Sequence, residues 1–433
     1  MTNRTVTNRV TNRVTNRGEQ PQGLITPGQR AEYMRQGNAS AVLRAVLAFG
    51  PVSRAEIARH TGLSAPSVTK LTSTLIEAGL LGELSPMEPT QGRPRVPLRV
   101  DPERTVALGV HIGLLRTTFG LVGLDGRVLL ERELAHGGGG ELTPRRIAAQ
   151  AAEGVRAFLD EKLAGRRLVG TGVSIGGWVD GARGLVVEHG PLGWRDVDLR
   201  AELVGKLPGP LVLEQTVRAI ARAELWFGAG REVDDFALVF IGNVLGAAIV
   251  VDRTVHRGPG AAAGGIEHLT ATDDPAVRCP RCGTGCLSVA AGDLALIAEA
   301  RAAGLLDPGP SGTAGGALDL ERLVAAARPA GSGSGDERAQ RLLRRRARRA
   351  GRAIATLVDL LNPSRVVLAG GILVADEYLD DLRAEVAERS HRGAAVAADI
   401  VPAVFGARTL VRSSAVPVLE RVITEPFTSL GLL

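Results

Sequence analysis

All three cysteines of this 433-residue chain lie within eight positions, in the stretch VRCPRCGTGC at residues 277–286. A tetrahedral zinc ion takes four nitrogen or sulfur ligands, and Cys279, Cys282 and Cys286 supply three. His268, eleven residues before the first cysteine, is the predicted fourth ligand. The spacing therefore predicts a structural zinc site, which would fix the path of this part of the chain.

Two other interpretations of the thiols are three buried reduced cysteines, or one disulfide with a spare thiol. The odd number of cysteines and the absence of a secretory signal argue against a disulfide. Gly283 favours the metal, because a glycine there lets the backbone fold over the ion with its N–H groups directed at sulfur.

The length predicts about two to three domains. A hydrophobic content of 45% and a charged content of 23% are typical of a soluble globular protein. The sequence has no run of eighteen apolar residues and no apolar segment behind a basic N-terminus. We therefore expect a cytoplasmic protein without a membrane span.

The positive charge is concentrated at one end of the chain. Residues 1–100 carry thirteen Arg or Lys and six Glu, a net charge of +7, and the remaining 333 residues carry −1. A basic domain attached to a neutral body is expected where that domain binds a polyanion. The aromatic content of 3% leaves little for stacking on single-stranded bases, which favours double-stranded DNA over RNA.

Residues 1–30 open with a Thr-Asn-Arg repeat that has too little apolar surface to fold, which predicts a disordered basic arm. Such an arm could follow DNA phosphates. The simpler interpretation is an extension without a function, or a start codon placed too far upstream, and we favour it.

Residues 31–100 carry the signals of a helix-turn-helix. Asn38 is a potential cap for a first helix that ends at Gly50, and Ser53 with Glu56 forms a capping box for a second helix. Gly62 then supplies a tight turn. The third helix has a predicted buried stripe of Val68, Leu71, Thr72 and Leu75. Its opposite side is predicted to enter a DNA groove and comprises Ser64, Pro66, Ser67, Thr69, Lys70 and Ser73.

After Gly79, the segment LLGELSPMEPTQGRPRVPLRV predicts a strand, a tip rich in Pro and Gly, and a second strand. Arg93 and Arg95 in the tip suit a wing that contacts phosphates or a minor groove. A small helical bundle without a DNA function can also carry caps and stripes. The order of three helices, a turn and a basic wing is more specific than any single part, and it predicts DNA binding.

Residues 101–433 alternate between strand and helix patterns, which predicts an α/β body. Asp125-Gly126 predicts a hairpin, and a second strand pair is predicted within residues 236–258. Residues 362–371 predict a further strand that ends at the paired glycines 370 and 371. The arginine-rich segment 337–361 could bind nucleic acid. Its apolar stripe favours a docked helix whose arginines face solvent; the stripe comprises Leu343, Ala347, Ala350, Ile354, Leu357 and Leu361.

These pieces together resemble the ROK family of repressors, open reading frames and sugar kinases, from about residue 35 to the end. The resemblance is carried by the helix-turn-helix, by GRPRVPLRVDP, LGVHIG, LGWRDVDL, ELWFGAG, IGNVLGAAIVVD and NPSRVVLAGG, and by the His/Cys cluster. It implies a winged helix-turn-helix followed by a two-lobed body, actin/hexokinase-like and so ribonuclease H-like, with zinc beside the sugar cleft. Repressor members have the DNA-binding domain, and kinase members lack it.

Three parts of the family's kinase machinery are altered. The aspartate of its first phosphate motif, Asp-x-Gly-Gly, corresponds to His111. A Gly-Thr-Gly turn that cradles phosphate reads Gly242, Asn243, Val244. The aspartate base of Glu-Asn-Asp-Ala corresponds to Thr216, whose hydroxyl cannot accept a proton as a carboxylate does. We therefore expect no kinase activity and no catalytic residue.

The sugar contacts implied by the resemblance are also reduced. Gly265 and Ser288 stand where the family has glutamates, Pro191 replaces an asparagine, and the middle cysteine is shifted by one position. Simple hexoses should therefore bind weakly. The residues expected to line an effector cleft are Trp194, Gln215, Thr216, Glu267, His268 and Ser288.

We interpret the chain as a zinc-containing transcriptional regulator of this type, with repression favoured, acting as a homodimer or a dimer of dimers. A dimer would place two recognition helices in successive major grooves of a double-stranded operator. A sugar-like effector would act by favouring one domain arrangement. One alternative keeps DNA binding and uses the body only as an oligomer or partner platform. A second is an active ATP-dependent sugar kinase with a fused DNA-binding domain.

Overall fold

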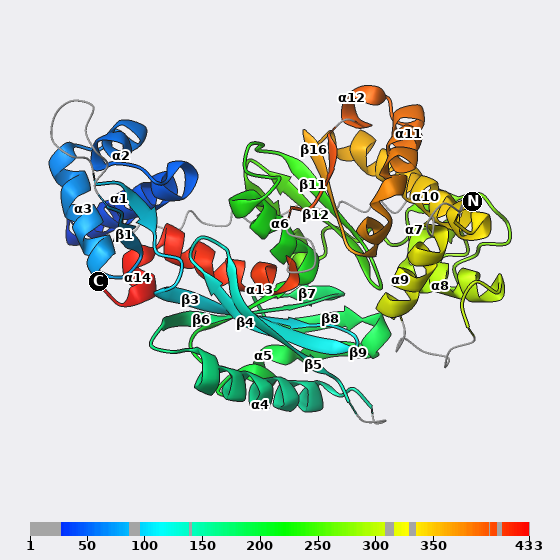
Figure 1. Cartoon of the computed structure of the whole chain (residues 1–433), viewed down its shortest axis with the longest axis horizontal. Coiled ribbons are helices and arrows are strands. Elements are labelled where there is room, and N and C mark those ends of the chain that lie inside the picture. The colour runs from blue at the N-terminus through cyan, green and yellow to red at the C-terminus, as the bar shows by residue number, and fades with distance from the viewer. Residues whose placement is uncertain are drawn as a thin grey trace, which may run out of the picture.

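The computed structural model describes residues 27–85, 96–137, 141–307, 316–328, 335–397, 399–404 and 409–432. Figure 1 shows a small N-terminal domain in blue beside a body of two α/β lobes, with the C-terminal helices in red between them. The expected α/β class and two-lobed organisation are confirmed. No helix in the described ranges is long and apolar enough to cross a membrane.

The N-terminal domain is a winged helix-turn-helix. Its two strands pair antiparallel, with Leu81 opposite Val100. The capping box of Ser53 and Glu56 forms as predicted, and Gly62 closes the second helix in a left-handed conformation with φ +71°. The elements are α1 (Pro27–Phe49), α2 (Arg54–Thr61), α3 (Ala65–Glu77), β1 (Leu81–Glu83) and β2 (Leu98–Val100).

The first helix is longer than the sequence predicted. It begins at Pro27, inside the segment expected to be a disordered arm, so Asn38 lies in its interior and does not cap it. Ala39 and Leu43 on this helix are fully buried and belong to a core shared with the C-terminal helices. The part of the helix from Ala39 onward therefore packs in a core that it shares with the body.

Lobe 1 is built on a five-stranded sheet of order β10-β6-β3-β4-β5. The predicted Asp125-Gly126 hairpin joins β4 to β5, and Gly126 has φ +77°. Beside this sheet lies a smaller sheet, β7-β8-β9. The elements are β3 (Thr105–Ile112), β4 (Arg116–Gly123), β5 (Val128–Ala135), α4 (Pro144–Lys162), β6 (Arg167–Ile175), β7 (Trp178–Asp180), β8 (Leu185–His189), β9 (Trp194–Asp198), α5 (Leu199–Leu203), β10 (Leu211–Gln215) and α6 (Thr216–Phe227).

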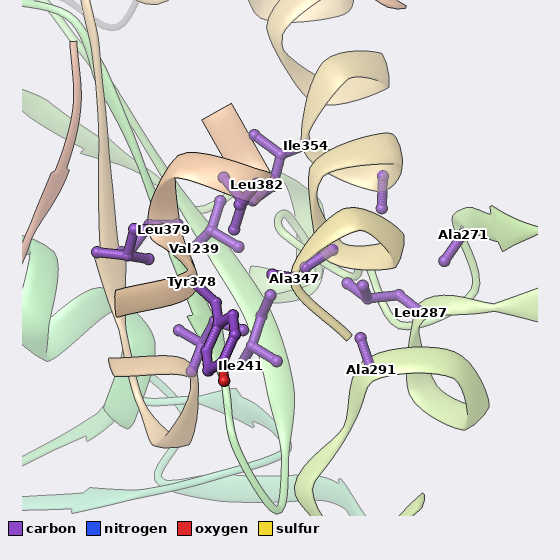
Figure 2. Close-up of a cluster of buried hydrophobic side chains, with 14 of the residues drawn as sticks. Val239, Ile241, Ala271, Leu287, Ala291, Ala347, Ile354, Tyr378, Leu379 and Leu382 are labelled. Atoms are coloured by element: carbon purple, nitrogen blue, oxygen red, sulfur yellow. The ribbon is translucent and has the colours of Figure 1, made fainter. Parts of the chain in front are cut away.

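Lobe 2 has a second five-stranded sheet of order β13-β12-β11-β16-β17, covered by helices. Its core lies between β11 and α10, where Val239 and Ile241 face Ala347 and Ile354 (Figure 2). The elements are β11 (Phe236–Ile241), β12 (Leu245–Val251), β13 (Thr254–His256), β14 (Thr270–Thr272), β15 (Gly285–Cys286), α7 (Leu287–Ala291), α8 (Asp293–Ala302), α9 (Gly316–Ala327), α10 (Glu337–Leu361), β16 (Arg365–Ala369), α11 (Leu379–Arg389), α12 (Ala394–Ala397) and β17 (Ile400–Pro402).

The helix α10 is the docked helix that the sequence favoured. Its predicted stripe is buried except at Leu361, which is 37% exposed. The arginines on its solvent side form ion pairs: Arg344 and Arg348 both pair with Asp381, and Arg352 pairs with Asp273. Arginines already paired with carboxylates offer less to a nucleic acid, which supports the interpretation of α10 as a docked helix.

The chain returns from lobe 2 to lobe 1 through α13 (Thr409–Thr424) and ends in α14 (Pro426–Leu430). The helix α13 lies directly on β3 and β6, where a Cβ atom on Gly109 would collide with the backbone oxygen of Val411. A Cβ atom on Gly172 would likewise collide with the backbone oxygen of Ser414. The helix α13 also contacts α1, so it connects the sheet of lobe 1 with the N-terminal domain (Figure 1).

Candidate DNA-binding surface, metal centre and interlobe cavity

The third helix separates buried and exposed residues as the sequence predicted. Its buried residues are Val68, Leu71, Thr72 and Leu75, which pack into the core of the domain. Ser64 caps its start by accepting a hydrogen bond from the backbone N–H of Ser67. The opposite side is a continuous exposed polar surface with one cation, formed by Ser64, Pro66, Ser67, Thr69, Lys70 and Ser73. We call this the α3 surface.

Other cations of the N-terminal domain differ in their availability. Arg54 is held by Glu83 at 2.7 Å and by the Thr72 hydroxyl at 3.1 Å, so it supports the domain. Arg59 on α2 is 71% exposed at its side chain, and Arg99 on β2 is exposed. Sequence reasoning did not single out these last two, because neither lies on the third helix or at the wing tip. Arg93 and Arg95 lie outside the described residues.

The four predicted metal ligands come together. The ligand atoms of His268, Cys279, Cys282 and Cys286 all lie within 4.8 Å of one another. The His268 Nδ1 atom is 3.8 Å from the Cys279 sulfur and 3.6 Å from the Cys286 sulfur. A tetrahedral zinc with bonds of about 2.3 Å to sulfur and about 2.0 Å to nitrogen sets these separations at about 3.5 Å. The donor set and its spacing fit zinc.

The local fold explains how residues far apart in sequence meet here. The strands β14 and β15 pair antiparallel, which brings Thr270 opposite Cys286. Gly283 has φ +73° and donates its backbone N–H to the oxygen of Cys279, so the turn closes as the sequence predicted. The three cysteines form no disulfide.

A cavity of about 340 Å³ opens between the two lobes. Its floor carries His111 at the end of β3 and Thr216 at the start of α6, with 3.5 Å between His111 Nδ1 and Thr216 Oγ1. A chain of hydrogen bonds runs from His111 Nδ1 to Ser174 Oγ at 3.0 Å, and from there to Ser414 Oγ on α13 at 2.7 Å. A buried chain of hydroxyl groups therefore links the His111 ring, which lines the cavity, to α13.

The two histidines that line this cavity are uncharged at neutral pH. Burial, together with a smaller electrostatic effect of nearby His189, lowers the pKa of His111 to about 4. Burial likewise lowers the pKa of His189 to about 4. Sequence reasoning missed His189, because a single histidine before a glycine carries no motif. The fold places its ring against Gly176 at the cavity wall.

The glycine turns of lobe 2 form another wall of the cavity. Asp293 lies against Gly371 and Gly242, and its carboxylate forms a buried ion pair with Arg346. Val244 directs its side chain at Gly176 on the opposite lobe. A carboxylate and a branched side chain therefore lie beside the glycines that line this part of the cavity.

The residues expected to line an effector cleft do not form one group. Thr216 lines the cavity, but Trp194 is 6% exposed and lies in the core of lobe 1, with its N–H donated to the backbone oxygen of Leu142. Gln215 donates its amide to the oxygen of Gly177. The other three lie near the metal centre: His268 belongs to it, and the Ser288 backbone N–H bonds the Glu267 backbone oxygen at 2.9 Å.

The chain matches known proteins over nearly its whole length. Residues 107–416 match the ROK family, and residues 36–88 match the MarR family. A transcriptional regulator of Mycobacterium bovis is 33% identical over 411 residues, which cover 92% of this chain and 88% of that protein. The N-acetylglucosamine repressor of Escherichia coli is 29% identical over 82% of this chain and 86% of its own length.

Two solved structures resemble this one. A ROK-family transcriptional regulator, described as a homologue of the Escherichia coli MLC protein, has a TM-score of 0.72 at 24% identity and covers 92% of this chain and 99% of its own. A ROK-family glucokinase from Streptomyces griseus, solved with glucose and AMPPNP, has a TM-score of 0.58 at 26% identity. The alignment with this glucokinase covers 72% of this chain and 98% of the glucokinase chain.

Proposed function

The chain belongs to the ROK family, and we propose that it is a DNA-binding transcriptional regulator that acts as a repressor. The observation that carries this proposal is the α3 surface, an exposed polar surface on a helix whose other side is fully packed. Relatives that align along most of the chain bear the names of transcriptional regulators and of a repressor. A glucokinase of the same family aligns only with 72% of the chain.

We propose that the α3 surface enters the major groove of an operator. Lys70 is its only cation, and it stands in the first half of the helix, which is the part that reaches base edges in this class of domain. The hydroxyls of Ser67, Thr69 and Ser73 are short enough to let the helix approach the bases. Arg93 and Arg95 would contact phosphates or a minor groove from the wing.

For the domain organisation, we propose an arm at residues 1–30, a DNA-binding domain at 31–100, and an effector and oligomerisation body at 101–433. The helical start at Pro27 supports a boundary a few residues earlier. A homodimer or homotetramer would match the two-fold symmetry of a palindromic operator. Sedimentation of the purified protein measures which assembly forms.

We propose that the metal centre binds one structural zinc ion through His268, Cys279, Cys282 and Cys286. Four protein ligands would leave no open position on the ion, which is the arrangement of a structural site and not of a catalytic one. Because the cluster holds His268, just before β14, next to Cys286, just before α7, the bound ion would also fix the neighbouring residues Glu267 and Ser288.

We propose that the protein is not a kinase. Phosphoryl transfer to a sugar needs a base for the hydroxyl proton and free N–H groups for phosphate, and His111, Thr216 and Val244 replace the groups that the resemblance implies. A sugar-like effector remains a proposal. Among the residues expected to bind it, Thr216 lines the interlobe cavity, and Glu267 Oε2 is buried without a hydrogen-bond partner among the described residues.

Genome-wide mapping of bound DNA tests the proposed function. We expect a small set of enriched near-palindromic sites close to gene starts, and the adjoining genes would indicate the effector class. Enrichment no greater than that of a variant lacking residues 1–100 would refute it. An ATP-hydrolysis assay with a panel of sugars tests the kinase alternative separately.

A further inference from the structure

The three thiols of the metal centre differ in their exposure. Cys279 and Cys286 are buried, whereas Cys282 is exposed. A small molecule in solution can therefore reach the Cys282 sulfur without any part of the fold opening. Zinc coordination alone does not require an exposed sulfur, so this feature is left unused by a purely structural metal site.

The exposed thiol also belongs to a Cys-x-x-Cys sequence. Cys279 and Cys282 are separated by Pro280 and Arg281, which is the spacing found in thiol pairs that form a reversible disulfide. In the reduced protein the two sulfurs lie within 4.8 Å of each other. A disulfide bond of about 2.05 Å therefore needs a shift of at most about 3 Å, and rotation of the exposed Cys282 side chain moves its sulfur on this scale.

Backbone hydrogen bonds hold this turn together independently of a metal. The Gly283 N–H donates to the Cys279 oxygen at 2.8 Å, and the Cys279 N–H donates to the Thr284 oxygen at 2.9 Å. Cys282 lies within the loop that these bonds close, so its sulfur would stay near that of Cys279 after the metal ligation is broken. Closing so short a loop with a disulfide costs little further chain entropy.

The ligand set keeps the exposed sulfur reactive. A cysteine bound to zinc is a thiolate, which is the form of the side chain that attacks an oxidant. Three thiolates on one Zn²⁺ give the centre a net negative charge, so each sulfur retains more electron density than in a site with two. The Arg278 guanidinium is held at the same turn by a hydrogen bond of 3.1 Å to the Gly283 oxygen, and its charge favours the thiolate further.

The turn also contacts lobe 1. Arg281, which lies between the two cysteines, pairs with Glu188 on β8 at 3.5 Å. Glu188 also accepts a hydrogen bond of 3.2 Å from Arg195 on β9. A chemical change at the two sulfurs would therefore take place beside a contact between the lobes.

We propose that the metal centre is a redox modification site, at which a hydroperoxide converts Cys279 and Cys282 into a disulfide and thereby releases the zinc ion. The inference rests on the proposed zinc centre and goes beyond it, because it assigns a reversible chemical change to that centre. The disulfide would be transient, as redox-sensing disulfides are in reducing compartments. Since Arg281 lies inside the new ring, the change would act on its contact with Glu188.

The oxidation takes place in two steps. The Cys282 thiolate attacks one oxygen of hydrogen peroxide, so that an S–O bond forms, the O–O bond breaks, and the departing hydroxide takes up a proton to become water. The Cys279 thiolate then attacks the sulfur of the Cys282 sulfenic acid, the S–S bond forms, and a second hydroxide leaves and is protonated to water. The two thiolates lose two electrons in total to the peroxide, and only His268 and Cys286 remain to hold the ion.

Peroxide treatment of the full-length, zinc-loaded protein tests the proposal. A zinc-sensitive dye follows the released metal, and mass spectrometry of proteolytic fragments locates the disulfide. With hydrogen peroxide at about 1 mM we expect about one zinc released per chain together with a Cys279–Cys282 disulfide, and a dithiol reductant with added zinc should restore the site. Zinc that stays bound would overturn the proposal, as would zinc loss with a disulfide to Cys286 or with oxidation that the reductant does not reverse.

Two variants that keep four potential ligands separate the exposed thiol from the rest of the centre. In Cys282→His a ligating nitrogen replaces the reactive sulfur, so peroxide should release zinc at least about tenfold more slowly than from the wild type. Cys286→His is the matched control, because it keeps the Cys279 and Cys282 pair and should respond as the wild type does. Equal release rates from the two variants would refute the role of Cys282. If either variant fails to bind zinc, the position of the disulfide in the wild type still decides the question.

The zinc content of the reduced protein separates this inference from the proposed metal centre. A zinc-free reduced protein would refute both. A reduced protein that contains about one zinc per chain and keeps it in peroxide would refute only the redox step. Operator binding by the reduced wild-type protein tests the proposed DNA-binding function on its own.

Discussion

Gln36, in the first helix of the DNA-binding domain, accepts a hydrogen bond of 3.1 Å from the backbone N–H of Phe427, near the other end of the chain. Its amide nitrogen donates to the Thr428 hydroxyl at 3.2 Å. The guanidinium of Arg35 lies over the Phe427 ring at 4.7 Å. These contacts join the DNA-binding domain to the C-terminal helices, and α13 continues from there to the interlobe cavity.

Replacing Gln36 should loosen this junction. In Gln36→Ala the buried N–H of Phe427 loses its partner, which typically costs about 1–3 kcal/mol of stability. Thermal or urea unfolding of the full-length protein measures the change, with exposed Glu32→Ala on the same helix as the control. Equal stability of the two variants would mean that the domains are held only by apolar packing.

The metal centre predicts a measurable dependence of folding on zinc. Protein purified without added metal should contain about one zinc per chain, and Cys282→Ser or His268→Ala should lower both the zinc content and the melting temperature, because binding energy contributes to folding. His256→Ala, an exposed histidine outside the cluster, should change neither. If wild-type protein from which the metal has been removed melts at the same temperature as the zinc-containing protein, the cysteines are merely buried thiols.

Restoring one carboxylate should not restore a kinase. In Thr216→Asp a base would return to the floor of the cavity, but His111 and Val244 would still replace groups needed for phosphate and its metal ion. We expect no sugar-dependent ADP release from the wild type or the variant. Turnover by Thr216→Asp above the wild-type background would show that the phosphate-binding parts still function.

The buried histidines predict how stability depends on pH. Their folded pKa values of about 4 lie below the ordinary value of 6.5, so the unfolded chain binds more protons between these limits. Stability should therefore be full above about pH 6.5 and fall as the pH drops toward 4. His111→Asn should flatten this slope, whereas exposed His391→Asn should not. Equal slopes in wild type and His111→Asn would indicate that this ring titrates normally in the folded state.

The local features of the fold could be predicted from the sequence. Caps, turns and buried stripes depend on residues within one or two turns of each other, which is why the capping box at Ser53 and the stripe of α3 were predicted correctly. The spacing of the cysteines likewise identified a set of groups that the structure brings together.

The features that depend on long-range packing could not be predicted. The helix α1 begins at Pro27 and contacts helices almost 400 residues away through Gln36, two residues before the cap signal of Asn38. Trp194 was expected at the cleft because of its motif, but its ring fills the core of lobe 1. His189 lacks any motif, and only the fold places it opposite His111 in the cavity.

Operator binding by a Lys70/Arg93/Arg95 triple alanine variant tests the central claim most directly. Lys70→Ala alone should weaken binding and relax sequence preference, whereas the two wing changes should weaken binding to all sequences and reduce its salt dependence. Fluorescence anisotropy with the mapped operator across a salt series measures both effects, and Arg344→Ala on α10 is the control. The account predicts that the triple variant loses most of its operator affinity while remaining folded, and unchanged affinity would contradict it.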